Sequence, residues 1–236
     1  MSMFRKNKKY LIPVLILMIA FSCSTTEQKK EADLHYKLGL AQLRSDQYQS
    51  AFVEFQKALD SDGGDKDIYN ALGYVYLKWD DPGNAEKSFS MAVKLDPDFS
   101  EGYNNLCLVE YQRQKYEKAA AYCEKALSNP LYPTPEKAFF NLGLALFKLK
   151  RYNDSIDALI QATRRKSDYY PAYYEMAVIY NLTGDYGNAS RSLERAIAFD
   201  PRFKGDMEKA EQFFQNGGAL PWCREDAAQI LEVFKY

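Results

Sequence analysis

The chain has 236 residues, and its 31 lysines and arginines nearly balance its 32 aspartates and glutamates, for a formal net charge of −1 at pH 7. Because the charge is balanced and no expected helix face carries a basic stripe, nucleic acid is not favoured as a partner. The 12 glycines and 9 prolines are too few for a low-complexity or fibrous chain, whereas 19 tyrosines and 14 phenylalanines are an unusually large aromatic content.

The first 22 residues differ from the rest. They contain a basic head of Arg5, Lys6, Lys8 and Lys9, followed by an apolar run at 10–21 that Pro13 interrupts. The run is too short to span a bilayer and has the size of a secretory signal. A small residue and then Cys23 follow it directly, which resembles a bacterial lipoprotein signal. A plain secreted protein and an uncleaved anchor are the alternatives.

The lipoprotein resemblance implies that Cys23 becomes the first residue and is acylated. Ser24, rather than aspartate, follows it, which is consistent with transfer to the outer membrane, facing the periplasm. Removing residues 1–22 takes away four basic side chains, so 27 basic residues remain against 32 acidic ones, a net charge of −5. Residues 23–31 are polar and unpatterned, and we expect the lipidated cysteine and a tether there.

A pattern of small and aromatic residues then recurs along the chain. The first small position is occupied by Gly39, Gly73, Cys107, Gly143 and Ala177, at spacings of 34, 34, 36 and 34. Its partner is Ala51, Ala85, Ala119, Ser155 and Ala189, and a third small position is alanine each time, at 58, 92, 126, 162 and 196. Small side chains at facing positions let two helices approach closely, so each unit is expected to be a helical pair.

This pattern resembles the tetratricopeptide repeat, whose period is about 34 residues. The resemblance implies an all-α fold, a right-handed superhelical solenoid of five to six repeats with one continuous core. We place five repeats at 32–65, 66–99, 100–135, 136–169 and 170–203. The segment 204–236 is expected to form an imperfect sixth repeat or capping helices, with Gly217 and Gly218 ending one helix and Pro221 opening a last helix that includes Trp222.

Two cysteines fall on facing positions of the third repeat. Cys107 occupies the glycine position of its first helix, and Cys123 the aromatic position of its second. In the oxidising compartment that a signal peptide implies, a Cys107–Cys123 disulfide would persist. Two buried thiols, or a bond from either cysteine to Cys223, are the alternatives.

The signal, the repeats and this cysteine pair together resemble the type IV pilus pilotin family, which are outer-membrane lipoproteins. The resemblance implies a protein that binds a secretin subunit and promotes its membrane targeting and multimerisation for pilus biogenesis. A tetratricopeptide envelope adaptor that recruits peptidoglycan hydrolases or outer-membrane assembly factors is the alternative.

The concave surface of the repeats is the expected binding groove, lined by the first helices. Its candidate residues are Tyr36, Leu40, Leu43, Asn70, Tyr74, Leu77, Asn104, Leu108, Tyr111, Phe140, Leu144, Phe147, Tyr174, Val178 and Asn181. They favour an extended or helical peptide with apolar anchors. Basic residues occur only at the rim, at Arg44, Lys78 and Lys148. Tetratricopeptide clamps for a C-terminal carboxylate have lysine and arginine within the groove instead. We expect about half of the groove residues to be covered by neighbouring repeats or by the C-terminal helices.

Catalytic and metal-binding motifs are missing from the sequence. It has no CxxC, HExxH, Walker-type loop or nucleophile elbow, and its single histidine, His35, occupies a repeat position that is usually aromatic. We therefore expect a non-enzymatic protein without a cofactor, a metal or a small-molecule substrate, whose partner is another protein.

Overall fold

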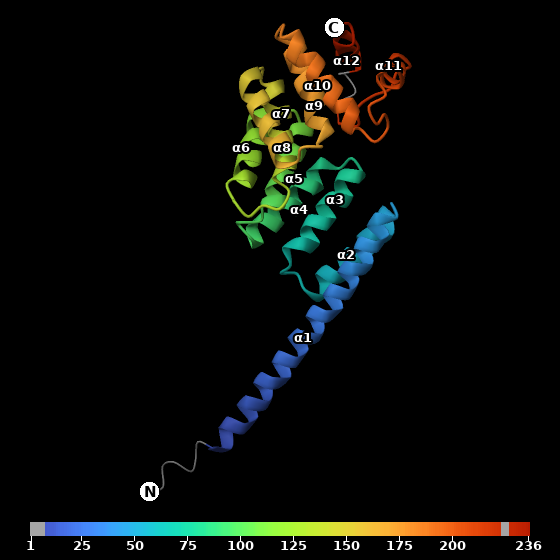
Figure 1. The fold of residues 1–236 in the computed structure, drawn as a ribbon. Helices are drawn as coiled ribbons and strands as arrows, with labels where there is room; N and C mark the ends of the chain where they lie inside the picture. Colours follow the sequence, from blue (N-terminus) through green and yellow to red (C-terminus); the bar gives the residue numbers. More distant parts are fainter. Residues whose placement is uncertain (1–7, 223–226) are drawn as a thin grey trace. The chain divides into compact units, whose positions relative to one another are not determined.

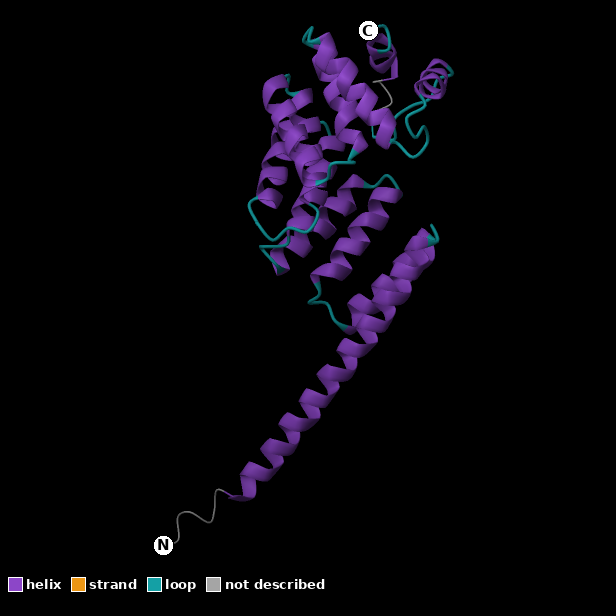
Figure 2. Cartoon of the chain, viewed as in Figure 1, coloured by secondary structure: helices purple, strands orange, loops and turns teal. Residues whose placement is uncertain are grey.

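A computed structural model describes residues 8–222 and 227–236 of the chain, with side chains described from Thr26 onward (Figure 1). Every element in these ranges is a helix, as the cartoon in Figure 2 shows, so the predicted all-α fold is confirmed. The chain divides into two compact units, Met1–Pro97 and Asp98–Tyr236, which we describe separately.

Unit 1 holds two helical pairs, α1 (Lys8–Arg44) with α2 (Tyr48–Ser61) and α3 (Lys66–Lys78) with α4 (Pro82–Leu95). The starts of α3 and α4 are set by aspartates: the Asp65 side chain accepts a hydrogen bond from the backbone N–H of Asp67, and that of Asp81 from Asn84. The core between the pairs contains Phe55, Ala58, Ile68, Leu72 and Val75, all almost fully buried. Burial of this apolar stripe, rather than helix propensity alone, stabilises such short helices.

Helix α1 runs through residues 23–31, which the sequence analysis assigns to an unpatterned tether. The helix continues through 26–31 because neither proline nor glycine interrupts Thr26–Glu31 and most of these residues favour a helix. Their side chains are exposed, and a spacer role stays a prediction. The side chain of Cys23 lies outside the described residues, as does that of Cys223.

Unit 2 contains three helical pairs: α5 (Ser100–Gln112) with α6 (Tyr116–Leu127), α7 (Pro135–Lys148) with α8 (Tyr152–Arg165), and α9 (Tyr170–Leu182) with α10 (Tyr186–Phe199). Two shorter helices follow, α11 (Met207–Gln215) and α12 (Ala227–Val233). The first helices of repeats two to five begin at 66, 100, 135 and 170, beside the expected repeat starts. Trp222 lies in a turn outside α12, so its predicted place in the last helix is wrong.

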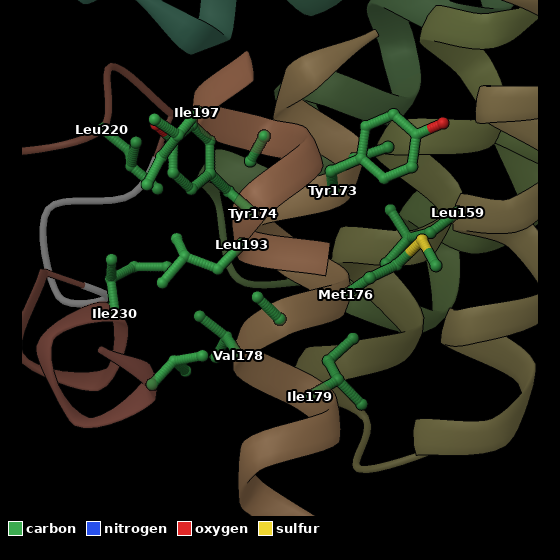
Figure 3. Close-up of a cluster of buried hydrophobic side chains, with 14 of the residues drawn as sticks. Leu159, Tyr173, Tyr174, Met176, Val178, Ile179, Leu193, Ile197, Leu220 and Ile230 are labelled. Atoms are coloured by element: carbon green, nitrogen blue, oxygen red, sulfur yellow. The ribbon is translucent and has the colours of Figure 1, made fainter. Parts of the chain in front are cut away.

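The largest core cluster lies in the C-terminal part of unit 2. Figure 3 shows Tyr174, Val178 and Leu193 from α9 and α10 on the same side as Leu220 and Ile230 of the C-terminal segment. Helices α11 and α12 add Ala210, Phe214 and Val233 to this cluster. The segment after residue 203 therefore caps the last repeat by burying apolar side chains against it.

Within each pair, a small residue on the first helix faces the residue 16 positions later on the second helix, and the sizes of the two side chains are complementary. A Cβ atom on Gly39 would lie 2.4 Å from the ring of Phe55, and one on Gly73 would lie 2.5 Å from that of Phe89. Gly143 faces Leu159 in the same way, at 2.8 Å. The fifth repeat has Ala177 and Leu193 at these positions, both buried in one cluster. The phenylalanine rings are thus paired with glycine, whereas leucine is paired with glycine in the fourth repeat and with alanine in the fifth.

This complementarity gives a prediction for Gly73 and Phe89. Gly73→Ala should destabilise α3 and α4, since overpacking a core costs about 1–3 kcal/mol while the better helix propensity of alanine returns about 1 kcal/mol. Adding Phe89→Leu reproduces the alanine–leucine combination of the fifth repeat and should remove most of the overpacking. Hydrogen exchange of the α3 and α4 amides in a double-mutant cycle measures the coupling, and strictly additive effects would contradict the proposed fit.

Candidate functional site

The part of the predicted groove that lies in unit 1 is partly exposed. We call it the unit 1 face: Tyr36, Leu40, Leu43, Asn70, Tyr74 and Leu77. These residues come from α1 and α3, where a spacing of three or four positions places side chains on one side of a helix. Tyr74 is 40% exposed and the others are half-buried. Tyr36, Leu40 and Leu43 also pack against the unit 1 core, which fixes their positions.

Lys78 lies beside Tyr74 at the end of α3. Its ammonium group is 5.1 Å from the centre of the Tyr74 ring and 6.0 Å from that of Tyr48. Hydrogen bonding with the Tyr74 hydroxyl raises the pKa of Lys78 above its ordinary value. The rim of the unit 1 face therefore carries a cation held against two aromatic rings, and an acidic residue of a partner could pair with it.

An aromatic group that the sequence analysis missed lies at the end of the same helix. Trp79, which is 39% exposed, packs its ring 5.2 Å from Phe52 and 6.0 Å from Tyr76. Trp79 falls outside the spacing used to select groove residues, because it is the residue after the last turn of α3. A tryptophan beside the turn between two expected helices was the signal available in the sequence, since tryptophan is enriched among residues that dominate binding.

In unit 2 the predicted groove residues divide into two groups. Four of them are half-buried: Leu108, Tyr111, Phe147 and Asn181. The side chain of Asn104 is buried, and its oxygen accepts a hydrogen bond from Asn141 at 2.9 Å. In contrast, four residues of α7 and α9 are 5% exposed or less: Phe140, Leu144, Tyr174 and Val178. These four cannot contact a partner while the surrounding structure is in place, so their predicted role in binding is not compatible with this conformation.

The chain's own C-terminal segment packs against Phe140 and Tyr174 and shares one core cluster with all four. The Trp222 ring lies 5.8 Å from Phe140 and 6.4 Å from Tyr174, centre to centre. The indole N–H of Trp222 donates a hydrogen bond of 2.8 Å to Oε1 of Glu175, a carboxylate that is only 1% exposed. Leu220, Ile230 and Val233 complete the cover. An aromatic side chain with a polar edge therefore fills this end of the predicted groove from within the molecule.

Tyr174 is held from its other end by an ion pair. Its hydroxyl donates to Oδ2 of Asp200 at 3.2 Å, and Asp200, which is fully buried, pairs with Arg202 at 2.6 Å. Burial, together with the negative charge of Asp200, raises the pKa of Tyr174 well above its usual range. The tyrosine is thus a neutral hydrogen-bond donor at physiological pH, and it links α9 to the turn after α10.

The third repeat is joined by a disulfide. Cys107 of α5 and Cys123 of α6 are bonded, with their Cα atoms 5.3 Å apart, and both residues are fully buried. Nearby on α5, the fully buried Glu110 accepts a hydrogen bond of 2.7 Å from Lys118 of α6, and Arg113 lies 3.7 Å away. A covalent bond and an ion pair of Lys118 with a buried carboxylate therefore both connect the helices of this repeat.

His35 has a structural partner. Its Nδ1 lies 2.7 Å from Oε2 of Glu54, so it links α1 to α2. Hydrogen bonds from Lys57 and from His35 lower the pKa of Glu54. Across the residues that the structure describes, no three His, Cys, Asp or Glu side chains are grouped to hold a metal ion. The same residues include no helix that combines the length and the apolarity needed to cross a bilayer.

The chain belongs to the tetratricopeptide repeat family, whose model matches residues 70–134 and 140–202. Proteins of this class are typically binding scaffolds rather than enzymes. The chain is similar to the type IV pilus assembly protein PilF of Pseudomonas aeruginosa, with 30% identity over 128 residues. That match covers 54% of this chain and 51% of PilF, so the matched stretch spans about half of the curated relative.

Two solved structures have the same fold. The PilF structure from Pseudomonas aeruginosa superposes with a TM-score of 0.67 at 24% identity, covering 80% of this chain and 91% of that one. The structure of PilW, described as a widely conserved type IV pilus biogenesis factor, gives a TM-score of 0.70 at 21% identity, covering 86% of this chain and 88% of that one. The chain is therefore a tetratricopeptide protein whose sequence is similar to that of a type IV pilus assembly protein.

Proposed function

We propose that this protein is a pilotin: an outer-membrane lipoprotein, anchored through Cys23 and facing the periplasm, that binds a secretin subunit and promotes its targeting and multimerisation. The similarity to PilF over 128 residues is the observation that carries the proposal, because PilF is named as a type IV pilus assembly protein. The fold shared with PilW and the disulfide in the third repeat are consistent with it.

The unit 1 face is the surface through which we propose that the secretin binds. Tyr74 and its half-buried neighbours offer apolar and aromatic contacts, with the amide of Asn70 and the cation of Lys78 beside them. In unit 2, Leu108 and Tyr111 also remain partly accessible. The matching ligand is an extended or helical segment with apolar anchors and an acidic residue placed for Lys78.

Tyr74→Glu should weaken secretin binding at least tenfold. A charged side chain at a buried anchor of an interface costs about 2 kcal/mol or more, and the exposed position of Tyr74 should leave the fold intact. Tyr186→Glu in unit 2 is the matched control, since Tyr186 is 47% exposed and lies outside the proposed face. Lys87→Glu on the exposed side of α4 is a second control. Isothermal titration with purified secretin measures the affinity.

In cells, Tyr74→Glu should leave the secretin as heat-labile monomers and remove surface pili, whereas Tyr186→Glu should not. If Tyr74→Glu binds the secretin as the wild type does, the unit 1 face is not the site. If a deletion strain keeps normal secretin multimers and loses recruitment of cell-wall hydrolases, the protein is an envelope adaptor instead.

Cys23→Ala should abolish membrane anchoring. Acyl chains on a cysteine bind the bilayer with about 0.8 kcal/mol per buried methylene, so several chains hold a protein firmly where one binds reversibly. We expect the variant to remain soluble in the periplasm or uncleaved in the inner membrane. Metabolic labelling with a clickable fatty acid is the measurement, and a wild-type protein that takes up no label is not a lipoprotein.

A further inference from the structure

The outer face of the first repeat is apolar and solvent-exposed. We call it the end face: Leu34 and Leu38 on α1 with Val53 on α2, which are 56%, 43% and 43% exposed. Helices α1 and α2 lie side by side (Figure 1), and the end face includes a hollow of about 400 Å³ between them. The hollow is lined by Leu38, Gln42, Gln49, Ser50, Val53 and Glu54.

The repeat pattern shows what normally covers the positions of Leu34 and Leu38. Thirty-four residues after Leu34 and Leu38 come Ile68 and Leu72, which are 1% and 2% exposed and pack in one cluster with α2. In unit 2, Leu142 occupies an equivalent position to Leu38, is 9% exposed and clusters with Ala119 and Ala120 of α6. The next equivalent, Met176, is 8% exposed in the cluster that contains Leu159 and Ala162 of α8. Later repeats therefore bury the positions of Leu34 and Leu38 under the second helix of the repeat before.

We propose that the end face pairs with the end face of a second copy of this chain, so that the protein forms a two-fold symmetric dimer. The face continues the interface that joins one repeat to the next, and so its natural occupant is another layer of paired helices. A head-to-tail contact would need a second bare face at the last repeat. There, however, Leu193 and Ile197 are covered by α11, α12 and Leu220. The end face must therefore meet itself, which gives an isologous interface.

The shape and charge of the end face suit this pairing. Leu34 lies one helical turn from Leu38, which lines the hollow, so in the proposed dimer the Leu34 of each copy packs toward the hollow of the other. The charged groups around the face are paired within one copy: Lys37 with Asp33 at 2.6 Å, and Glu54 with both His35 and Lys57 at 2.7 Å. Two copies consequently meet with little repulsion between like charges.

The test is the oligomeric state of the full chain in detergent, measured by size-exclusion chromatography with light scattering corrected for bound detergent. We expect the wild type to shift from monomer to dimer as its concentration rises through the micromolar range. Leu34→Glu should lower the dimerisation constant at least tenfold, and Leu38→Gln should lower it by a smaller factor. Leu182→Glu is the matched control, because Leu182 is 48% exposed on a helix of unit 2. This variant should dimerise as the wild type does.

A wild-type chain that stays monomeric at high micromolar concentration overturns the dimer, whatever the variants do. A dimer that survives Leu34→Glu unchanged also overturns it, because association would then use another part of the chain. Circular dichroism of each variant checks that the fold is retained. The secretin proposal is tested separately: Leu34→Glu should bind secretin normally, and Tyr74→Glu should dimerise normally.

Discussion

Trp222→Ala should destabilise the C-terminal part of unit 2 by about 3 kcal/mol, at the lower end of the range for removing a core tryptophan because Trp222 is only half-buried. The variant loses the ring contacts with Phe140, Tyr170 and Tyr174. It also removes the N–H group that donates to the buried Glu175 carboxylate. Removing a hydrogen-bond donor from a buried carboxylate costs free energy. The lost packing and the lost hydrogen bond therefore both destabilise the folded state.

Hydrogen exchange of the α9 and α12 amides measures this effect locally. Trp222→Phe should restore part of the loss, since it keeps a ring against Phe140 but cannot donate to Glu175. Trp79→Ala in unit 1 is the control and should leave exchange in α9 unchanged. Unaltered exchange in α9 after Trp222→Ala would mean that the C-terminal segment does not hold the last repeat together.

Loss of the disulfide should be the second large effect. Replacing Cys107 and Cys123 with alanine removes a cross-link that closes a loop of 16 residues, and the loop-entropy model gives about 3 kcal/mol for such a loop. The helical signal should persist in the folded variant, because each repeat is also stabilised by its neighbours. The melting temperature should fall, with the greatest increase in hydrogen exchange in α5 and α6.

A reducing agent should lower the melting temperature of the wild type and leave that of the Cys107→Ala, Cys123→Ala variant unchanged. Non-reducing mass spectrometry of the purified protein should find the peptides of Cys107 and Cys123 linked. A bond from either cysteine to Cys223 would show that the protein has a different pairing in solution.

The helical pairs were predictable because their signals are periodic. Gly39 and Gly73 recur at the repeat spacing. Each must be glycine because a phenylalanine ring of the second helix leaves no space for a Cβ atom. The alanines at 58, 92, 126, 162 and 196 are all fully buried in the structure. A position that must be small in every repeat leaves a pattern that a single sequence displays.

The accessible part of the candidate site was less predictable, because it depends on a segment without a period. Nothing at the positions of Phe140 and Tyr174 distinguishes them in the sequence from Tyr36 or Leu40. Their burial follows from the docking of Trp222 and Ile230, which lie outside the repeats. In the same way, Leu34 and Leu38 have the residue types of a buried repeat position, and only the structure shows that they are bare.

The size-matched pairs at the helix crossings also bear on how the chain avoids misfolding. Five similar repeats in one chain give every first helix several wrong second helices to choose from during folding. A first helix with Ala177 placed against Phe89 would clash, and one with Gly73 placed against Cys123 would leave an unfilled space. Crossings of different composition thus discriminate against each other's partners, whereas the Gly39–Phe55 and Gly73–Phe89 crossings do not. Making all five crossings identical should raise the population of misregistered species during refolding, even if the native state became no less stable.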